Sequence, residues 1–228
     1  MNPFSQSSLL RFLGYTLLIM SVIDLIDTLV PLRLMDPLWR FQAMGQLVER
    51  VPVPLIGLVT VFYGDRDRLA KWERSLLKLL SWAALLVGTG YLLLVLVGVF
   101  STLQIDRFND NQVKQQIARS MTELEAIKGQ LKGIKTEAQM QAFLSNIQGL
   151  PPEIKESKQL EYSKKKVTDL ITKGAETSIN QLKQNYFDQR LQLLKQSVKW
   201  NIGSLISGVL LIVIWRITEY ARSSEIIE

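Results

Sequence analysis

Two acidic residues interrupt an apolar segment near the start of the chain. Asp24 and Asp27 stand within a run that extends from Phe12 to Pro31. Their i, i+3 spacing predicts that both carboxylates lie on one face of a helix. An ionised acid costs at least about 2.5 kcal/mol at the centre of a bilayer, so such residues need a partner or a proton. We therefore treat this pair as the first candidate for function.

Three basic residues are candidate partners for these acids within the chain: Arg11, Arg33 and Arg50. One interpretation is a structural ion pair close to the outer membrane interface. The alternative is that the acids contact another subunit or carry a proton or an ion. The sequence leaves both interpretations open.

The remaining composition argues against catalysis. The chain contains no Cys and no His, which excludes disulfides, thiolate nucleophiles and metal sites that need sulfur or imidazole ligands. The acid pattern of residues 65–67 is too short to identify a metal-nucleotide site. The acids and amides at 106–111 lack the glycine and distal glutamate of a calcium loop. We expect no enzyme activity, no catalytic residue, no metal site and no cofactor.

Four apolar segments are the elements that would position Asp24 and Asp27. They cover about residues 10–31, 51–64, 79–103 and 200–215, and a bilayer core of about 30 Å needs about 20 helical residues to cross it. The segment at 51–64 has only 14 residues and contains Pro52 and Pro54, so its helix would reach about 21 Å. It is either a short span or a re-entrant segment.

Between the third and fourth segments the composition becomes polar and basic. Residues 104–199 hold 16 basic and 11 acidic residues, and so carry five of the six net positive charges. Apolar residues recur there at spacings of three and four, typical of a helical stripe, from Ile117 through Met121 to Ala138 and again from Val167 to Tyr186. Gly and Pro at 149–152 would end one helix and start a return.

The sequence therefore predicts an all-α integral membrane protein with about four transmembrane helices and a long extramembrane antiparallel helical hairpin. The expected parts are a membrane domain at 1–103, the hairpin at 104–199 with its turn at 149–152, and a last span with a tail at 200–228. We expect each arm to be one helix of about 45 residues that continues directly from its span. A small-residue face on the last span would let it pack closely, and it comprises Gly203, Ser204, Ser207 and Gly208.

Charge predicts the orientation. Short cationic loops stay in the cytoplasm, which places the basic connection at 64–78 and the C-terminus there and the hairpin on the periplasmic or lumenal side. The tandem Lys164, Lys165 and Lys166 are either a solvated face or a patch for a polyanion. No nucleic-acid-binding motif is present, and we expect no nucleic-acid partner.

The first 60 residues carry a family resemblance. They resemble the N-terminal part of the cyanobacterial HpsJ-like membrane proteins, which are associated by name with hormogonium polysaccharide secretion and, in some members, with exosortase-linked systems. The resemblance implies a cyanobacterial plasma or thylakoid membrane, and it carries no catalytic motif onto this chain. It lies in residues 12–14, 21–24, Pro31, Asp36, Trp39, 47–50 and 53–57.

Three functions are compatible with these features. The first is a non-enzymatic scaffold, in polysaccharide secretion if the resemblance holds. The second is an accessory or assembly subunit of a large membrane complex, such as a photosynthetic one. The third is a small transporter or channel-like oligomer that uses Asp24 and Asp27. The expected partners are membrane lipid, other integral membrane proteins and a second copy of the chain.

The predicted orientation can be tested by labelling single cysteines, because the natural chain contains none. A cysteine near Lys71 should react with an impermeant reagent only from the cytoplasm, and a cysteine near Gly149 only from the opposite side. Cytoplasmic labelling near Gly149 would contradict the orientation.

Overall fold

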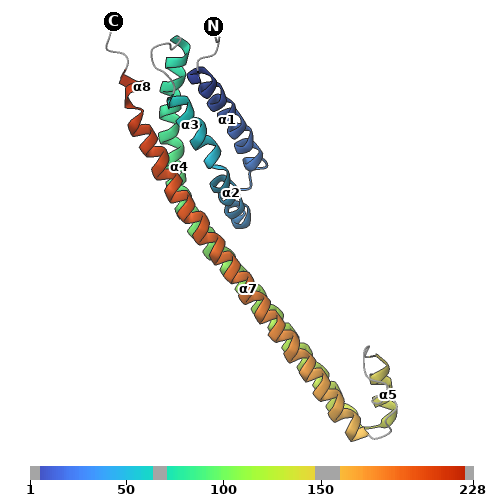
Figure 1. Ribbon diagram of the computed structural model, residues 1–228. Coiled ribbons are helices and arrows are strands. Elements are labelled where there is room, and N and C mark those ends of the chain that lie inside the picture. The colour runs from blue at the N-terminus through green and yellow to red at the C-terminus, as the bar shows by residue number, and fades with distance from the viewer. Residues whose placement is uncertain (1–5, 64–70, 147–159, 224–228) are drawn as a thin grey trace. The chain divides into compact units, whose positions relative to one another are not determined.

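The computed structural model describes residues 6–63, 71–146 and 160–223, and every element in these ranges is a helix (Figure 1). The all-α prediction is therefore confirmed for the described part of the chain. The helices are α1 (Gln6–Leu29), α2 (Pro37–Arg50), α3 (Pro52–Tyr63), α4 (Lys71–Gly133), α5 (Glu137–Asn146), α7 (Leu160–Ile217) and α8 (Glu219–Ser223).

Four helical segments are long and apolar enough to cross a membrane, as the sequence predicts. They lie within Leu9–Leu29, Pro37–Tyr63, Trp72–Gly133 and Glu161–Ile217. The second of these joins α2 to α3 and is longer than the apolar run at 51–64. The described part of the chain is thus all-helical and contains four candidate membrane spans.

Two compact units make up the chain. Unit 1 comprises Met1–Ile105 and Gln192–Glu228, and unit 2 comprises Asp106–Leu191. The two longest helices, α4 and α7, each contribute residues to both units. The turn predicted at 149–152 lies outside the described residues.

In unit 1, α1 packs against α3 at a pair of glycines. A Cβ atom at Gly14 would stand 2.9 Å from the carbonyl oxygen of Gly57 and 2.5 Å from Oγ1 of Thr60. A Cβ atom at Gly57 would likewise stand 3.2 Å from the carbonyl oxygen of Gly14. The two helices approach so closely because neither carries a side chain at the crossing.

A helix that the sequence analysis did not predict precedes α3. Asp36 caps α2 by accepting a hydrogen bond from the backbone N–H of Leu38 at 2.9 Å, and Pro37 occupies the first turn. The backbone of Val51 is still helical, but Pro52 and Pro54 lack the N–H groups that would continue the helix. The proline pair therefore separates α2 from α3.

The ends of the helices show how α3 runs through unit 1. An ion pair of 3.7 Å joins Arg11 at the start of α1 to Glu73 at the start of α4. The hydroxyl of Tyr220 in α8 donates to the carbonyl oxygen of Phe62 at 3.1 Å, so the end of α3 lies near the end of α7. The start of α3 lies instead near the C-terminal part of α1, where Arg50 meets Asp24. This geometry favours a crossing segment over a re-entrant one.

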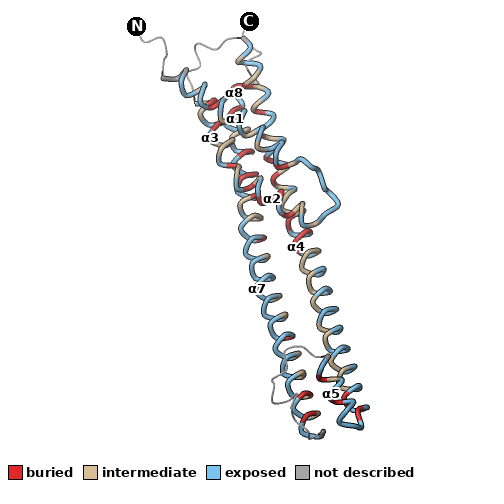
Figure 2. Tube along the Cα trace, turned by 90° about the vertical axis from the view of Figure 1, so that its right-hand side faces the viewer, coloured by how far each residue is buried: buried red, intermediate tan, exposed pale blue. Residues whose placement is uncertain are grey.

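The α4 and α7 helices pack closely in unit 1 through small side chains. A Cβ atom at Gly208 would stand 2.9 Å from the carbonyl oxygen of Gly88. Ser204 is fully buried, and its hydroxyl donates to the carbonyl oxygen of Tyr91 at 2.6 Å. Further hydroxyl contacts of 2.8 Å join the two ends of this seam, between Thr102 and Ser197 and between Ser81 and Thr218. Figure 2 shows the buried residues on the inner sides of these helices.

Unit 2 contains the antiparallel parts of α4 and α7. Arg190 forms an ion pair of 2.9 Å with Asp106, whereas Val167 shares a buried cluster with Leu131 and Ile134. The contacting residues of α4 and α7 are therefore fewer positions apart in the sequence near Ile134 than near Asp106. This is the pattern of two antiparallel helices. The predicted neighbours Ile134 and Val167 lie in one cluster, but Met121 is 53% exposed, so its assignment to the buried stripe was wrong.

The first arm is shorter than predicted. The α4 helix ends at Gly133, and a separate helix, α5, begins at Glu137. Thr136 and Gln139 form a capping arrangement: Oγ1 of Thr136 accepts from the N–H of Gln139, and Oε1 of Gln139 accepts from the N–H of Lys135. This capping starts a new helix, so the prediction of one 45-residue arm was wrong. Ala138, which the sequence assigned to the apolar stripe, is exposed. The residues of α5 that are buried against Leu131 and Val167 are Met140 and Leu144.

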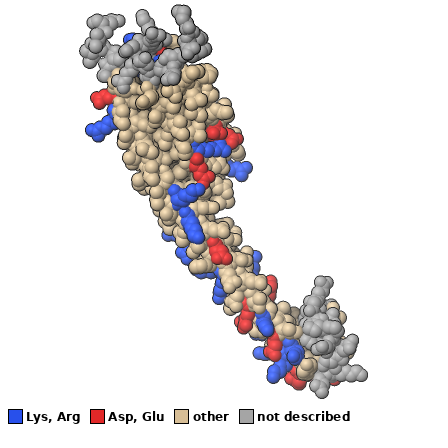
Figure 3. Space-filling model, viewed as in Figure 1, with Lys and Arg blue, Asp and Glu red and all other residues tan. Residues whose placement is uncertain are grey.

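The two units differ in their surfaces. On the face drawn in Figure 3, much of the surface of unit 1 is uncharged, and charged side chains of both signs line unit 2. Large exposed hydrophobic residues are frequent in the candidate spans, including Phe12, Ile19, Leu86 and Leu96. Such a surface is typical of helices that contact lipid.

The close packing of α1 on α3 predicts the effect of a single methyl group. Gly14→Ala should lower the free energy of unfolding of the protein in detergent by about 1–3 kcal/mol, because its Cβ meets backbone and side-chain atoms of α3. Gly90→Ala is the matched control, since a Cβ there meets nothing within 4 Å and the change should stabilise the helix by up to about 1 kcal/mol. Equal thermal stability of the two variants would contradict the packing.

Candidate intramembrane ion-pair site

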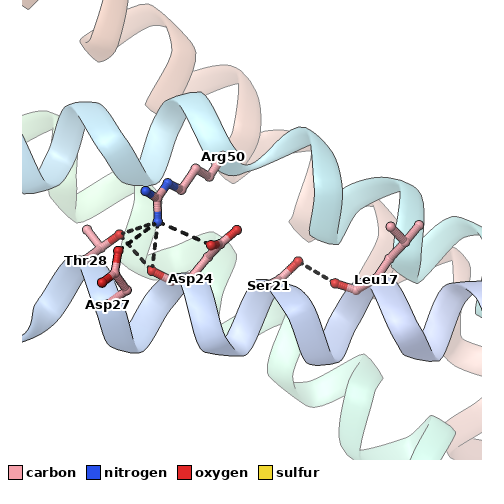
Figure 4. A network of polar contacts seen from close by, with 6 residues as sticks. All are labelled: Leu17, Ser21, Asp24, Asp27, Thr28 and Arg50. Atoms are coloured by element: carbon pink, nitrogen blue, oxygen red, sulfur yellow. Dashed lines mark hydrogen bonds and ion pairs between the residues drawn. The ribbon is translucent and has the colours of Figure 1, made fainter.

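Asp24 and Asp27 converge on one arginine (Figure 4). Nη1 of Arg50 lies 3.4 Å from Oδ1 of Asp24 and 3.6 Å from Oδ2 of Asp27. The same nitrogen donates to Oγ1 of Thr28 at 3.3 Å. The structure thus selects Arg50 among the three arginines that the sequence offers.

Helix geometry explains the convergence. Asp24, Asp27 and Thr28 follow i, i+3 and i+4 spacing on α1, so their side chains share one face. Arg50 is the last residue of α2, and its guanidinium spans the gap between α2 and α1. It also donates to the backbone carbonyl oxygen of Asp24 at 3.3 Å. The site therefore joins the C-terminal part of α1 to the α2–α3 junction.

The other two candidate partners lie elsewhere. Arg11 pairs with Glu73 at the opposite end of α1. Arg33 is exposed in the connection between α1 and α2.

The ion pair is partly exposed and negatively charged. The side chains of Arg50, Asp24 and Asp27 are 40%, 49% and 75% exposed. Two carboxylates face one guanidinium, so their formal charges sum to −1. The separations are longer than the 2.7–2.9 Å of strong charge-assisted hydrogen bonds, which leaves room for another polar group to join.

An apolar cavity of about 220 Å³ adjoins the ion pair. Asp24, Thr28 and Arg50 contribute to its polar edge, and its other walls are mainly leucine, valine and alanine side chains from α1, α3, α4 and α7. No group of three or more acidic side chains is placed to hold a metal ion within the described ranges. The site can therefore hold helices together and present polar groups beside an apolar space.

The small residues of the last span lie in helix contacts. Ser204 and Ser207 are buried, and Gly208 faces Gly88 of α4. Gly203 faces a different helix, because a Cβ there would stand 2.5 Å from Cγ1 of Val48 in α2. In this structure all four residues pack within unit 1.

The three lysines of unit 2 do not share one environment. Lys164 is partly buried and lies 3.8 Å from Oε1 of Glu161. Lys166 stands 6.0 Å from the ring centroid of Tyr162, and Lys165 is exposed. Two of the three cations therefore already have neighbours within α7.

Two polar clusters were not found from the sequence. At one end of unit 1, Oε1 of Glu49 accepts from Lys199 at 2.7 Å and from Nε1 of Trp200 at 3.1 Å. At the other end, the guanidinium of Arg222 lies 4.3 Å from the ring centroid of Trp215 and donates to Ser81 at 2.7 Å. Tryptophans beside charged residues at both ends of apolar runs were the signal that could have indicated them.

Comparison with known proteins places the chain in a family. A family model described as HpsJ-like protein matches residues 5–219. No curated protein and no solved structure matches the chain significantly. The family match covers nearly the whole chain, whereas the resemblance seen from the sequence covered mainly its first 60 residues.

The convergence of two acids on one arginine predicts unequal effects of substitution. Arg50→Gln should lower the free energy of unfolding in detergent by about 1–2 kcal/mol, because it leaves two carboxylates without their cation. Asp27→Asn should cost less, since Asp24 keeps its pair. Combining Arg50→Gln with Asp24→Asn and Asp27→Asn should recover part of the loss.

Arg33→Gln provides the matched control because Arg33 is exposed in the loop that follows α1. The stability of that variant should equal that of the natural protein. If Arg50→Gln and Arg33→Gln behave alike, Arg50 does not hold α1 in place.

Proposed function

We propose, from the premise that the chain belongs to the HpsJ-like protein family, that it is a non-enzymatic integral membrane protein that scaffolds other membrane components. The observation that carries the proposal is the division of α4 and α7 between two environments. Each helix contains an apolar stretch in unit 1 that is long enough to cross a membrane, and their parts in unit 2 form a charged antiparallel pair. A membrane anchor needs the apolar surface of unit 1, and a binding arm in water needs the charged surface of unit 2.

Exposed aromatic residues support a binding role for unit 2. Phe108 and Phe187 are 63% and 62% exposed, and Tyr162 is 49% exposed. Large aromatic side chains are costly to leave in water and are enriched among the residues that dominate protein interfaces. Unit 2 is therefore the proposed contact surface for partner proteins.

Charge supports an orientation with the hairpin on the periplasmic or lumenal side. The starts of α1 and α4 and the end of α7 lie at one end of unit 1, and this end carries several cations. By the positive-inside rule this end faces the cytoplasm. These cations are Arg11, Arg74, Lys78, Arg216 and Arg222.

Membership of the HpsJ-like protein family supports a particular membrane and a particular process. We place the protein in a cyanobacterial plasma or thylakoid membrane, with a role in polysaccharide secretion, because the family name is associated with that process. In this role the hairpin would hold secretion components together, and the spans would keep it in the bilayer. A second copy of the chain is among the candidate partners.

A second candidate is an accessory or assembly subunit of a large membrane complex. The observation that favours it is an open groove on the outer face of α4, lined by Trp82, Leu86, Thr89, Gly90 and Leu93. Small residues in such a groove let another helix approach closely. A transporter that uses Asp24 and Asp27 has less support, because Arg50 already pairs with both acids.

The test compares two substitutions that introduce the same charge three residues apart. Val167 is fully buried between the arms, and Leu170 is 39% exposed on the same helix. Val167→Asp should destabilise unit 2 by several kcal/mol, on the order of the cost of a buried unpaired charge, and Leu170→Asp should not. Full-length variants are purified in mild detergent and their partners are identified by mass spectrometry.

The scaffold proposal expects Val167→Asp to lose proteins of the polysaccharide envelope machinery that the natural protein and Leu170→Asp retain. If Val167→Asp keeps all its partners, unit 2 is not their contact surface. Recovery of one large stoichiometric complex with all three proteins would favour the accessory-subunit candidate.

A further inference from the structure

The apolar cavity beside the ion pair has the shape of a binding site. Its lining on α1 extends from Leu18 to Thr28, about 15 Å along the helix axis. The opposite walls come from α3, α4 and α7, including Leu58, Ala84 and Leu211. A volume of about 220 Å³ over this length describes a narrow space rather than a round one.

Local packing explains why the space is open. The glycine pair Gly14 and Gly57 brings the N-terminal half of α1 close to α3. Further along, α4 contributes Ala83 and Ala84 to the wall, and these short side chains do not fill the gap. The salt bridge of Arg50 to Asp24 then joins the C-terminal part of α1 to the end of α2 beside the cavity.

We propose that this cavity binds one acyl chain of a membrane lipid whose headgroup is uncharged and rich in hydroxyl groups. The chain lies among the leucine, valine and alanine side chains. The headgroup contacts Arg50, Asp24 and Asp27. This inference goes beyond the scaffold role and does not depend on it.

The apolar walls of the cavity favour a hydrocarbon chain as its ligand. Apolar cavities of about 150 Å³ exclude water and accept apolar molecules, and this cavity is larger. Its walls belong to four candidate spans, so acyl chains would surround its mouth in a bilayer. A lipid chain is therefore the apolar ligand available at the highest concentration.

The polar edge selects the headgroup. The hydroxyls of Ser21 and Thr28 already donate to the carbonyl oxygens of Leu17 and Asp24, both at 2.8 Å. The groups that remain to contact a headgroup are the guanidinium of Arg50, which donates, and the carboxylates of Asp24 and Asp27, which accept. Every glycerophospholipid headgroup carries a phosphate, which would be repelled by a site whose formal charges sum to −1. A hydroxyl can accept from the guanidinium and donate to a carboxylate, so it satisfies both.

The position along the helix fits a headgroup. Asp24 lies five residues before the end of α1, about 7 Å along the axis, and Asp27 lies closer still. Lipid headgroups and the ends of spans occupy the same interfacial layer of a bilayer. A lipid can therefore place its head at Asp24 and Asp27 while its chain extends towards Leu18.

The test uses the full-length protein in detergent with added lipids of equal chain length, measured by native mass spectrometry. Val87→Phe should fill the cavity, because Val87 lines it and is 44% exposed. Val99→Phe is the matched control on the same helix, since Val99 is 48% exposed and does not line the cavity. Ala83→Leu is a second filling variant in case Val87→Phe fails to fold.

A monoglycosyl diacylglycerol should bind the natural protein at least about tenfold better than phosphatidylglycerol or phosphatidylethanolamine. Filling variants should lose about tenfold of this binding, and Val99→Phe should lose none. A lipid with a photoreactive group near the end of its chain should crosslink to residues around Leu18, Leu58 and Leu80.

Equal lipid binding by Val87→Phe, Ala83→Leu and Val99→Phe would overturn the cavity assignment. Preference for an anionic or zwitterionic lipid would overturn the headgroup assignment. Neither result would bear on whether unit 2 binds partner proteins, which is measured separately by Val167→Asp.

Discussion

The close approach of α4 and α7 is the constraint on which the rest of unit 1 depends. Two helices can come this near only where both lack bulky side chains, as at Gly88 and Gly208. The same device recurs where α2 meets α7, at Gly45 against Trp200 and at Val48 against Gly203. At each glycine, a backbone atom, a ring or an aliphatic side chain of the neighbouring helix occupies the space that a Cβ atom would need. The helices are thereby held by close packing, which a bilayer does not weaken as it weakens the hydrophobic effect.

The chemistry of the α4–α7 contact differs between the two units. In unit 1 the buried hydroxyls of Ser204, Thr102 and Ser197 find partners across the seam, because unpaired polar groups are costly where water is absent. In unit 2 the contact includes Leu131, Ile134 and Val167, whose burial is favourable only in water. One pair of helices thus uses hydrogen bonds and small residues in one unit and apolar side chains in the other. This contrast supports a membrane setting for unit 1 and an aqueous setting for unit 2.

The sequence predicted the helical class and the four candidate spans, because long apolar runs and periodic stripes are local signals. It did not predict α2, although Asp36 followed by Pro37 is a helix start, because this segment is amphipathic and lies outside the four apolar runs. It also missed the end of the first arm, where the T-x-x-Q pattern at Thr136 starts a new helix. The sequence named Arg50 only as one of three candidate partners. The choice among them, and the cavity beside it, depend on where α1 lies against α3, which is a tertiary property that no local pattern contains.

In this structure α4 and α7 of one chain pack against each other. The most direct test introduces cysteines at Leu131 and Val167, which share a buried cluster, into a chain that has no other cysteine. Normal and isotopically heavy chains are expressed together in one membrane and treated with a short thiol crosslinker. If the account is right, the crosslinked peptides carry the same isotope, both light or both heavy. Crosslinks that join light to heavy peptides in random proportion would show that the arms pair between chains, and would contradict it.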